Sequence, residues 1–517
     1  ILFEYFKKCI MGEMNPASCA DVISLLKESR KQELEEDITM SQALETYIPL
    51  QANNYSFTDN DDNKNNNAYD CYQHVIDLLI ERKEEKDEQQ KVIILQGKSG
   101  SGKSLFCRHL EETLWESYVN DYTTSIPVYI SLPKCYNELN EKQIISQALQ
   151  MKQITKEMMD VIRENISFVF ILDGFDEIFD KYDKNNNNEK YFYDRFNLNE
   201  WNAKMIVSCR SLVLNDEDID QVLIGSKNIM TPMIHLWPFS REQINGYIDK
   251  FVKMNKKNKM NDYLDWTIQQ YETTLKNYPN LNKMIEEPFL LRMILTVLPS
   301  LMGQHSIGTR ISKAQVYEAF NEQWIDAHVK NVVNKLSELR IQTSPKKVKF
   351  AFQQYCQDLA FEMFIQGNQV ATENDYKGYE NNNIWSKLDP EMETDTKYLD
   401  EKLELKIDNT KISAEKTHDI WNQYFNGDST AKYVLRRVGD NKYQFLHKSC
   451  QEYYAAQKII FDIISWKPNT VIVDNQQFQQ QFEQHAPELS INRKLLNEEL
   501  GIIQFIAERV YDINPIF

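Results

Sequence analysis

The stretch KVIILQGKSGSGKS, residues 91–104, decides the fold that we expect for this chain. Residues 92–95 are an unbroken apolar run rich in β-branched side chains, which predicts a strand buried on both faces of a parallel sheet. Three glycines then interrupt the run. The spacing Gly97-x4-Gly102-Lys103-Ser104 matches a phosphate-binding loop, in which a glycine-rich backbone turns its N–H groups toward phosphate oxygens.

The residues after the glycines supply the charge and the hydroxyl that such a loop needs. Lys103 is expected to reach the β- and γ-phosphates, and the Ser104 hydroxyl to bind Mg²⁺. A helix that begins near Lys103 adds the positive end of its dipole. A plain glycine turn between a strand and a helix is the alternative. The candidate nucleotide-binding residues of the loop are Gly97, Gly100, Ser101, Gly102, Lys103, Ser104 and Leu105.

A second landmark is SFVFILDGFDE, residues 167–177. The apolar run at 168–172 predicts another buried strand, which delivers Asp173 to the carboxyl edge of the sheet, where ligands bind in such folds. Asp173 is expected to bind Mg²⁺ through water, and Asp176 or Glu177 to polarise a water molecule or hold the outer shell of the metal. An acidic cap between a strand and a helix is the alternative.

Three more short apolar runs, at 127–132, 204–208 and 234–236, predict strands that alternate with helical segments. This alternation favours right-handed βαβ units and a parallel sheet. Arg210 follows the run at 204–208, and a guanidinium at that edge is suited to contact the γ-phosphate, because its donors match phosphate oxygens.

The flanking segments are mostly helical in pattern. Residues 1–45 predict short helices without recognisable chemistry, and residues 72–90 predict an amphipathic helix. The Asn-rich tracts at 53–67 and 182–190 are expected to be loops. Further helices are expected at 312–334, 349–364, 451–464 and 495–510, and a β-hairpin with its turn at 439–442 is expected within 434–446.

Composition limits the classes of partner and compartment. The 517 residues carry a net charge of −18, which disfavours nucleic acid as a partner. The eight cysteines are scattered without metal-ligand spacing, as is typical of reduced thiols in a cytoplasmic protein. No apolar run reaches the length of a membrane span. The chain begins with Ile1 rather than Met, so we expect a fragment of a longer protein.

Five motifs, taken together and in this order, resemble those of NACHT-domain proteins, which belong to the STAND class of P-loop NTPases and include the Nod-like immune receptors. The motifs are GKSGSGKS at 97–104, ILDGFDE at 171–177, VSCRS at 207–211, EPFLL at 287–291 and FLHKSCQEYYAA at 445–456. The resemblance covers about residues 45–465. It implies an α/β P-loop NTPase with a parallel sheet, followed by a small helical domain and a winged-helix domain.

The resemblance also implies roles for residues that their local sequence does not single out. Pro288 would contact the adenine from the helical domain, and His447 would contact the diphosphate from the winged helix and hold the closed state. Without the resemblance, both would be ordinary residues at helix starts. Three departures from the family pattern affect only the fine geometry: Pro288 follows two glutamates rather than a glycine, Cys450 stands where the family often has an aromatic residue, and Asn-rich insertions lie at several places.

The function that the resemblance implies is a switch in signal transduction. It would be closed with ADP, would open and self-associate with ATP, and would hydrolyse ATP slowly, with Mg²⁺ as cofactor. A C-terminal repeat array outside this chain would bind a protein ligand. ATP rather than GTP rests on the resemblance alone. The alternatives are a mechanochemical ATPase that acts on protein or nucleic acid, and a scaffold that binds nucleotide without hydrolysis.

The expected domain division has five parts. Residues 1–90 hold N-terminal helices and a linker, residues 91–240 the nucleotide-binding domain, and residues 241–311 the helical domain. Residues 312–465 form the winged-helix domain with insertions, and residues 466–517 a truncated helical segment.

Overall fold

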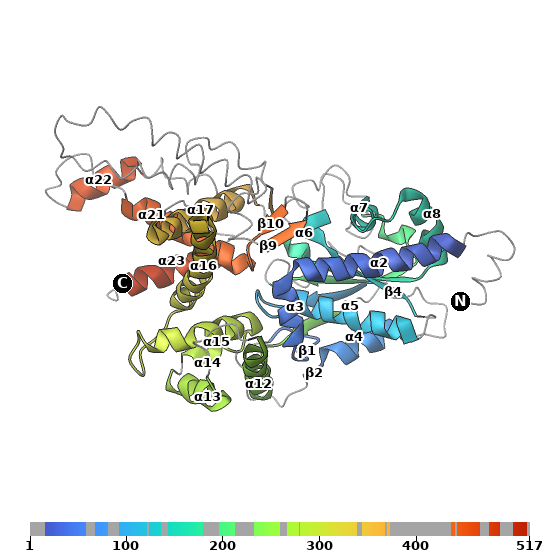
Figure 1. Cartoon of the computed structure of the whole chain (residues 1–517), viewed down its shortest axis with the longest axis horizontal. Helices are drawn as coiled ribbons and strands as arrows, with labels where there is room; N and C mark the ends of the chain where they lie inside the picture. The colour runs from blue at the N-terminus through green and yellow to red at the C-terminus, as the bar shows by residue number, and fades with distance from the viewer. Residues whose placement is uncertain are drawn as a thin grey trace. The chain divides into compact units, whose positions relative to one another are not determined.

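A sheet of mainly parallel strands positions the glycine loop. The structure is a computed structural model, and it describes residues 16–57, 68–80, 92–120, 124–135, 143–178, 196–211, 232–258, 266–278, 280–338, 344–367, 370–372, 436–439, 442–465, 475–485 and 500–513. The Asn-rich tract at 182–190, most of the one at 53–67, and residues 81–90 of the helix predicted at 72–90 lie outside these residues. We describe the elements with the labels of Figure 1.

The five apolar runs all form the strands that they predict. These are β3 (Val92–Gln96), β4 (Ile126–Ser131), β5 (Phe168–Asp173), β6 (Ala203–Cys209) and β7 (Met233–Leu236). They pair in parallel in the order β7-β3-β6-β5-β4. Strand β6 therefore lies between the strand that enters the glycine loop and the strand that ends at Asp173. The carboxyl ends of these three strands meet at one edge of the sheet.

Two short strands that the sequence does not predict extend the sheet to seven strands. Strand β1 (Gln51–Asn53) pairs antiparallel with β7, and β2 (Tyr69–Asp70) pairs antiparallel with β1. The prediction that a loop begins at Asn53 is wrong at its first residue, because Asn53 is buried in β1 and pairs with His235. Strands of two or three residues contain no run long enough to show a periodicity.

Helices cover both faces of the sheet (Figure 1). Those before and after the loop are α2 (Pro16–Glu36), α3 (Ile38–Glu45), α4 (Cys71–Ile80), α5 (Lys103–Asn120), α6 (Leu132–Cys135), α7 (Ile144–Met151) and α8 (Lys156–Asn165). The helix predicted after the loop is confirmed as α5. The expectation of only short helices in residues 1–45 is wrong, because α2 has 21 residues.

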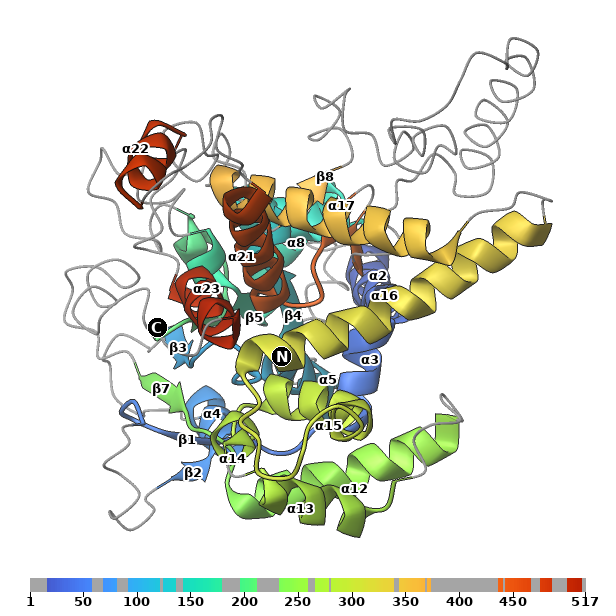
Figure 2. The ribbon, with the colours of Figure 1, turned by 90° about the vertical axis from the view of Figure 1, so that its left-hand side faces the viewer.

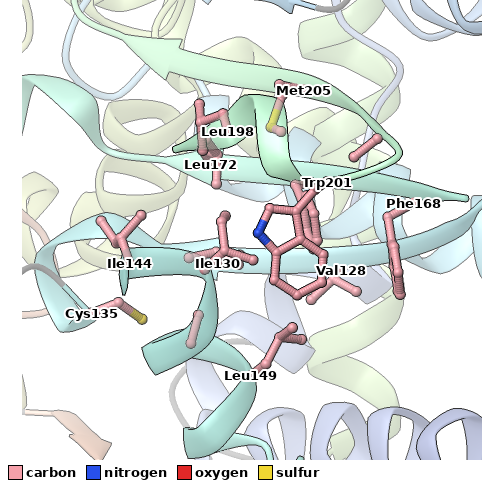
Figure 3. Close-up of a cluster of buried hydrophobic side chains, with 14 of the residues drawn as sticks. Val128, Ile130, Cys135, Ile144, Leu149, Phe168, Leu172, Leu198, Trp201 and Met205 are labelled. Carbon is pink, nitrogen blue, oxygen red and sulfur yellow. The ribbon is translucent and has the colours of Figure 1, made fainter. Parts of the chain in front are cut away.

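One hydrophobic core joins the sheet to α2, α7 and α8 (Figure 3). Its centre is Trp201, whose indole stands edge-on to the rings of Phe168 and Phe170. Val22 and Leu26 bring α2 into the same core. Helix α2 is therefore packed on one face of the sheet.

Four helices follow the sheet: α12 (Arg241–Asn258), α13 (Ile268–Asn277), α14 (Leu281–Met284) and α15 (Pro288–Met302). A capping box begins α12. The Ser240 N–H donates to Gln243 Oε1 at 2.7 Å, and the Gln243 N–H donates to Ser240 Oγ at 3.3 Å. These reciprocal bonds satisfy donors that a helix start leaves unpaired.

The chain divides into two compact units, which we describe separately: residues 1–299 with 306–309, and residues 300–305 with 310–517. In the second unit α16 (Lys313–Glu338), α17 (Pro345–Gln366), α21 (Lys448–Ser465) and α23 (Leu500–Ile513) pack against one another (Figure 2). The unit also contains α22 (Asn475–His485). The five-part domain division stays a prediction.

The hairpin predicted near residue 440 is confirmed as β9 (Arg436–Gly439) and β10 (Lys442–Gln444). An unexpected third strand, β8 (Ala371–Thr372), pairs with β10.

Every helix in the described ranges is too short or too polar to cross a membrane.

Candidate functional site

The loop between β3 and α5 has a backbone that only glycine adopts without strain. Gly100 has φ +79° and Gly102 has φ +95°, both in the left-handed region. A Cβ on Gly97 would stand 2.5 Å from Ser101 Oγ and 3.2 Å from Leu236 Cβ. The backbone therefore requires glycine at 100 and 102, and a side chain at 97 would crowd Ser101 and Leu236.

The loop leaves several hydrogen-bond donors without partners. Among the described residues, the amide N–H groups of Ser99, Gly100 and Gly102 meet no backbone acceptor. The hydroxyls of Ser99 and Ser101 are buried and have no hydrogen-bond partner there. Buried donors of this kind are costly unless a ligand satisfies them. The loop thus fits an anion, and phosphate oxygens supply the acceptors that it lacks.

Lys103 closes over this loop. Its Nζ donates to the carbonyl of Gly97 at 2.7 Å and to the carbonyl of Lys98 at 3.0 Å. Burial lowers the pKa of Lys103 below its ordinary value, and Arg210 lowers it further, while Asp176 and Asp173 raise it. The structure therefore brings four predicted site residues into one electrostatic group. A bound phosphate would favour the protonated lysine in the same way as the two carboxylates do.

Asp173 ends β5 and is buried, as the apolar run predicts. Its Oδ2 accepts a hydrogen bond from the Tyr129 hydroxyl at 2.8 Å, and its Oδ1 accepts one from the Ser208 hydroxyl. Ser208 also accepts the Gly174 N–H at 2.9 Å. Two hydroxyl groups from the neighbouring strands β4 and β6 thus hold the carboxylate. Sequence reasoning missed both, because each lies inside a run that predicts only a buried strand.

Asp176 and Arg210 form an ion pair beside the loop. Arg210 Nε lies 2.9 Å from Asp176 Oδ2, and the Arg210 N–H donates to Asp176 Oδ1 at 3.2 Å. The side chain of Asp176 is 4% exposed and that of Arg210 is 18% exposed. Glu177 lies in the same 3₁₀ turn, Phe175–Glu177. The carboxylate predicted to polarise water is therefore engaged with the arginine predicted to contact phosphate.

The segment that begins α15 packs directly on the glycine loop. The Phe289 N–H donates to the Gly100 carbonyl at 3.3 Å. A Cβ on Gly102 would lie 3.9 Å from Pro288 Cγ and 3.4 Å from Leu50 Cδ1. Pro288 thus lies beside the loop, and its predicted contact with the adenine stays a prediction. Leu50 was missed, since only its place after Pro49 in an extended segment is visible in the sequence.

His447 belongs to the second unit, so its predicted contact with a diphosphate stays a prediction. It immediately precedes α21, and its Nδ1 accepts the Ser449 N–H at 3.2 Å. The Ser449 hydroxyl lies 2.6 Å from the same nitrogen and accepts a hydrogen bond from Tyr317 at 2.7 Å. A ring nitrogen that accepts an N–H carries no proton, so the proton of the neutral imidazole is on Nε2. That nitrogen is a donor suited to a phosphate oxygen.

The residues present fit Mg²⁺ held together with a nucleotide. Ser104 is the second residue of α5 and is exposed, and Asp173 lies at the same edge of the sheet. Mg²⁺ is usually bound by one or two protein oxygens, substrate phosphates and water. Groups of three or more His, Cys, Asp and Glu side chains that could hold a metal without a nucleotide are absent from the described residues.

A substitution at Gly102 tests the loop geometry. We expect Gly102→Ala to destabilise the first unit by about 1–2 kcal/mol, because a side chain is strained at positive φ. Gly246→Ala in α12 is the matched control, since its Cβ would lie at an ordinary 3.6 Å from Ile48. That change should stabilise the protein by up to ~1 kcal/mol. Thermal unfolding of both variants measures the difference, and equal midpoints would contradict the strained loop.

Comparison with known proteins identifies the family of a domain within the first unit. The family model described as the NACHT domain matches residues 91–255. No curated protein matches the sequence. Solved structures similar to the chain include ORC2 of Aeropyrum pernix in ADPNP and ADP complexes, with TM-score 0.32 and 10% identity, covering 80% of this chain and 96% of that chain.

Two others are Drosophila ORC bound to DNA and domain III of the Thermotoga maritima replication initiation protein DnaA. The first has TM-score 0.28 and 10% identity, covering 81% of this chain and 91% of that chain. The second has TM-score 0.26 and 12% identity, covering 52% and 93%. These TM-scores are low. The family match and the loop geometry agree: residues 91–255 of this chain are a NACHT domain, of the P-loop NTPase class.

Proposed function

We propose that this chain is an ATP/ADP-dependent switch in signal transduction, of the STAND class. It would be closed with ADP, would open and self-associate with ATP, and would reset by slow hydrolysis. The observation that carries the proposal is the contact of the α15 start with the glycine loop, through the Phe289 N–H and the Gly100 carbonyl at 3.3 Å. A helical segment that touches the phosphate loop can respond to what the loop holds.

In this proposal the loop residues bind the nucleotide, and Pro288 contacts its adenine. Lys103 offsets charge on the β- and γ-phosphates, while Ser104 and Asp173 hold Mg²⁺. Bound Mg²⁺ would supply further charge neutralisation at the phosphates. Asp176 or Glu177 orients the attacking water. Arg210 is paired with Asp176, and a γ-phosphate would compete with that carboxylate for its guanidinium.

We assign the second unit the role of holding the switch closed. The strands β9 and β10 with α21 would form a winged helix, from which His447 donates Nε2–H to the diphosphate of ADP. Self-association with ATP and a protein ligand bound through C-terminal repeats complete the proposal. The charge of −18 argues against nucleic acid. We place the protein in the cytoplasm on the resemblance.

The test is to purify the chain without added nucleotide, denature it, and identify what is released by ion-exchange chromatography. We expect about one ADP per chain, because a closed switch traps its ligand. A protein that is empty and turns over ATP quickly would instead be a mechanochemical ATPase. One that binds nucleotide without turnover even when self-associated would be a scaffold.

Two variants of His447 distinguish two roles for this residue: a latch, meaning a contact with the diphosphate of ADP that holds the closed state, and a cap of helix α21. His447→Ala removes both the imidazole and the acceptor for the Ser449 N–H. His447→Asn keeps an acceptor at a position where asparagine is among the preferred caps. We expect both proteins to lose the bound ADP during purification. Loss from the alanine variant alone would mean that His447 only caps α21, and the latch would be abandoned.

A further inference from the structure

A buried charge cluster joins α2 to the helix that follows the glycine loop. We define the cluster as Glu33 on α2, Arg108 and Glu111 on α5, and Lys152 after α7. Arg108 donates to Glu33 Oε2 at 2.6 Å and to Glu111 Oε2 at 2.9 Å. Lys152 Nζ donates to the other oxygen of Glu33. Both helices belong to the first unit and are labelled in Figure 1. Glu33 is therefore the group through which α2 reaches both cations.

The cluster fixes one residue of the sheet, Tyr129 on β4. The Cζ of Arg108 lies 3.6 Å from the centroid of the Tyr129 ring, so the guanidinium stacks on the ring face. The Tyr129 N–H donates to Glu111 Oε1 at 3.1 Å. Both the side chain and the backbone of Tyr129 are thus held by cluster residues.

Tyr129 in turn holds Asp173, because its hydroxyl donates to Asp173 Oδ2 at 2.8 Å. A carboxylate oxygen can only accept in this bond, so the phenol hydroxyl is the donor. A hydrogen bond from a neighbouring group sets the orientation of a carboxylate that binds a metal.

We propose that Tyr129 is a positioning residue for Asp173, and that the docking of α2 through Glu33 sets the divalent-cation affinity of the nucleotide site. The contacts run without a break from Glu33 through Arg108 and Tyr129 to Asp173. If α2 moves away, Lys152 and Arg108 lose the carboxylate of Glu33, and Arg108, which then keeps only Glu111, must rearrange. The ring stacked on Arg108 then loses its support. The inference rests on the proposed role of Asp173 in the binding of Mg²⁺.

Tyr129→Phe tests the link to the metal. This change keeps the ring under Arg108 and removes only the hydroxyl. The measurement titrates Mn²⁺ into the protein with bound ADP and follows free Mn²⁺ by electron paramagnetic resonance. We expect an affinity for Mn²⁺ about tenfold weaker than that of the wild type, as for other partners of metal ligands. The affinity for ADP measured in EDTA should stay unchanged.

Glu33→Gln tests the link to α2. We expect faster hydrogen exchange in α2 and a weaker affinity for Mn²⁺, in the same direction as Tyr129→Phe. Glu35→Gln is the matched control on the same helix, because Glu35 is exposed and pairs only with Lys31 at 3.8 Å among the described residues. That variant should bind Mn²⁺ as the wild type does. If Glu33→Gln fails to fold, Tyr129→Phe still decides whether the cluster reaches the metal.

The outcomes separate this inference from the proposed function. We call the chain of contacts from Glu33 through Arg108 and Tyr129 to Asp173 the relay. If both variants bind Mn²⁺ with the affinity of the wild type, the relay is overturned, and the proposed switch is not affected. Loosening of α2 in Glu33→Gln without a change in Mn²⁺ affinity would reduce the cluster to a structural ion pair and also overturn the relay. A wild-type protein that binds ADP but shows no affinity for Mn²⁺ would overturn the metal role of Asp173, and the relay with it.

Discussion

A Lys103→Ala protein is expected to bind ATP·Mg²⁺ at least about a hundredfold more weakly than the wild type. Charge-assisted hydrogen bonds are worth about 1.5–3 kcal/mol each, and a lysine that contacts two phosphates makes more than one. Equilibrium titration with a fluorescent ATP analogue measures the loss. Lys98→Ala is the matched control, because Lys98 stands in the same loop with an exposed side chain. A Lys103→Ala protein with wild-type affinity would end the assignment of the loop as a nucleotide site.

The same titration repeated at alkaline pH gives a second readout. Burial lowers the pKa of Lys103 in the free protein, whereas a bound phosphate favours the charged lysine. Binding then takes up a proton once the pH exceeds the lowered pKa, so the affinity of the wild type should fall as the pH rises. Lys103→Ala should not show this fall. Parallel profiles for the two proteins would mean that Lys103 does not contact the phosphates.

The centre of the fold could be predicted because its strands are buried on both faces. Such strands appear as unbroken apolar runs, and all five were found, with the glycine loop and Asp173 at their carboxyl ends. Strands β1 and β2 could not be found in the same way, since three and two residues contain no pattern. The hairpin β9–β10 was visible because a turn sequence separates its two runs.

The residues that hold the site were harder to predict than the residues that would bind the ligand. Tyr129 lies two residues before Ser131, which pairs with Asp173 across the strands. The hydrogen bond from its hydroxyl to Asp173 can be predicted only when that register is known. Arg108 and Glu111, three residues apart on a helix, resemble an ordinary solvated pair. Glu33, which is distant in sequence, completes the cluster by its contact with Arg108. No local sequence pattern predicts such a contact.

The largest effect on stability is expected from Glu33→Gln. Although burial raises the pKa of Glu33, Lys152 and Arg108 outweigh it, so that the pKa falls from 4.5 to about 2. A shift of this size corresponds to roughly 3 kcal/mol of stability in the charged state. Removal of one partner from a buried ion pair costs about the same. We therefore expect Glu33→Gln to lower the free energy of unfolding of the first unit by about 3 kcal/mol at pH 7.

The pH dependence identifies the charge as the cause. A carboxylate with a depressed pKa stabilises the folded state fully above its unfolded pKa, and this contribution is lost as the pH falls toward the folded pKa. The difference between the wild type and Glu33→Gln should therefore be constant above about pH 5 and fall to less than half by about pH 3. Urea unfolding at several pH values measures it, with Glu35→Gln expected within about 0.5 kcal/mol of the wild type throughout. A difference that does not change with pH would show that Glu33 acts through packing, and that α2 is not held to Arg108 and Lys152 by charge.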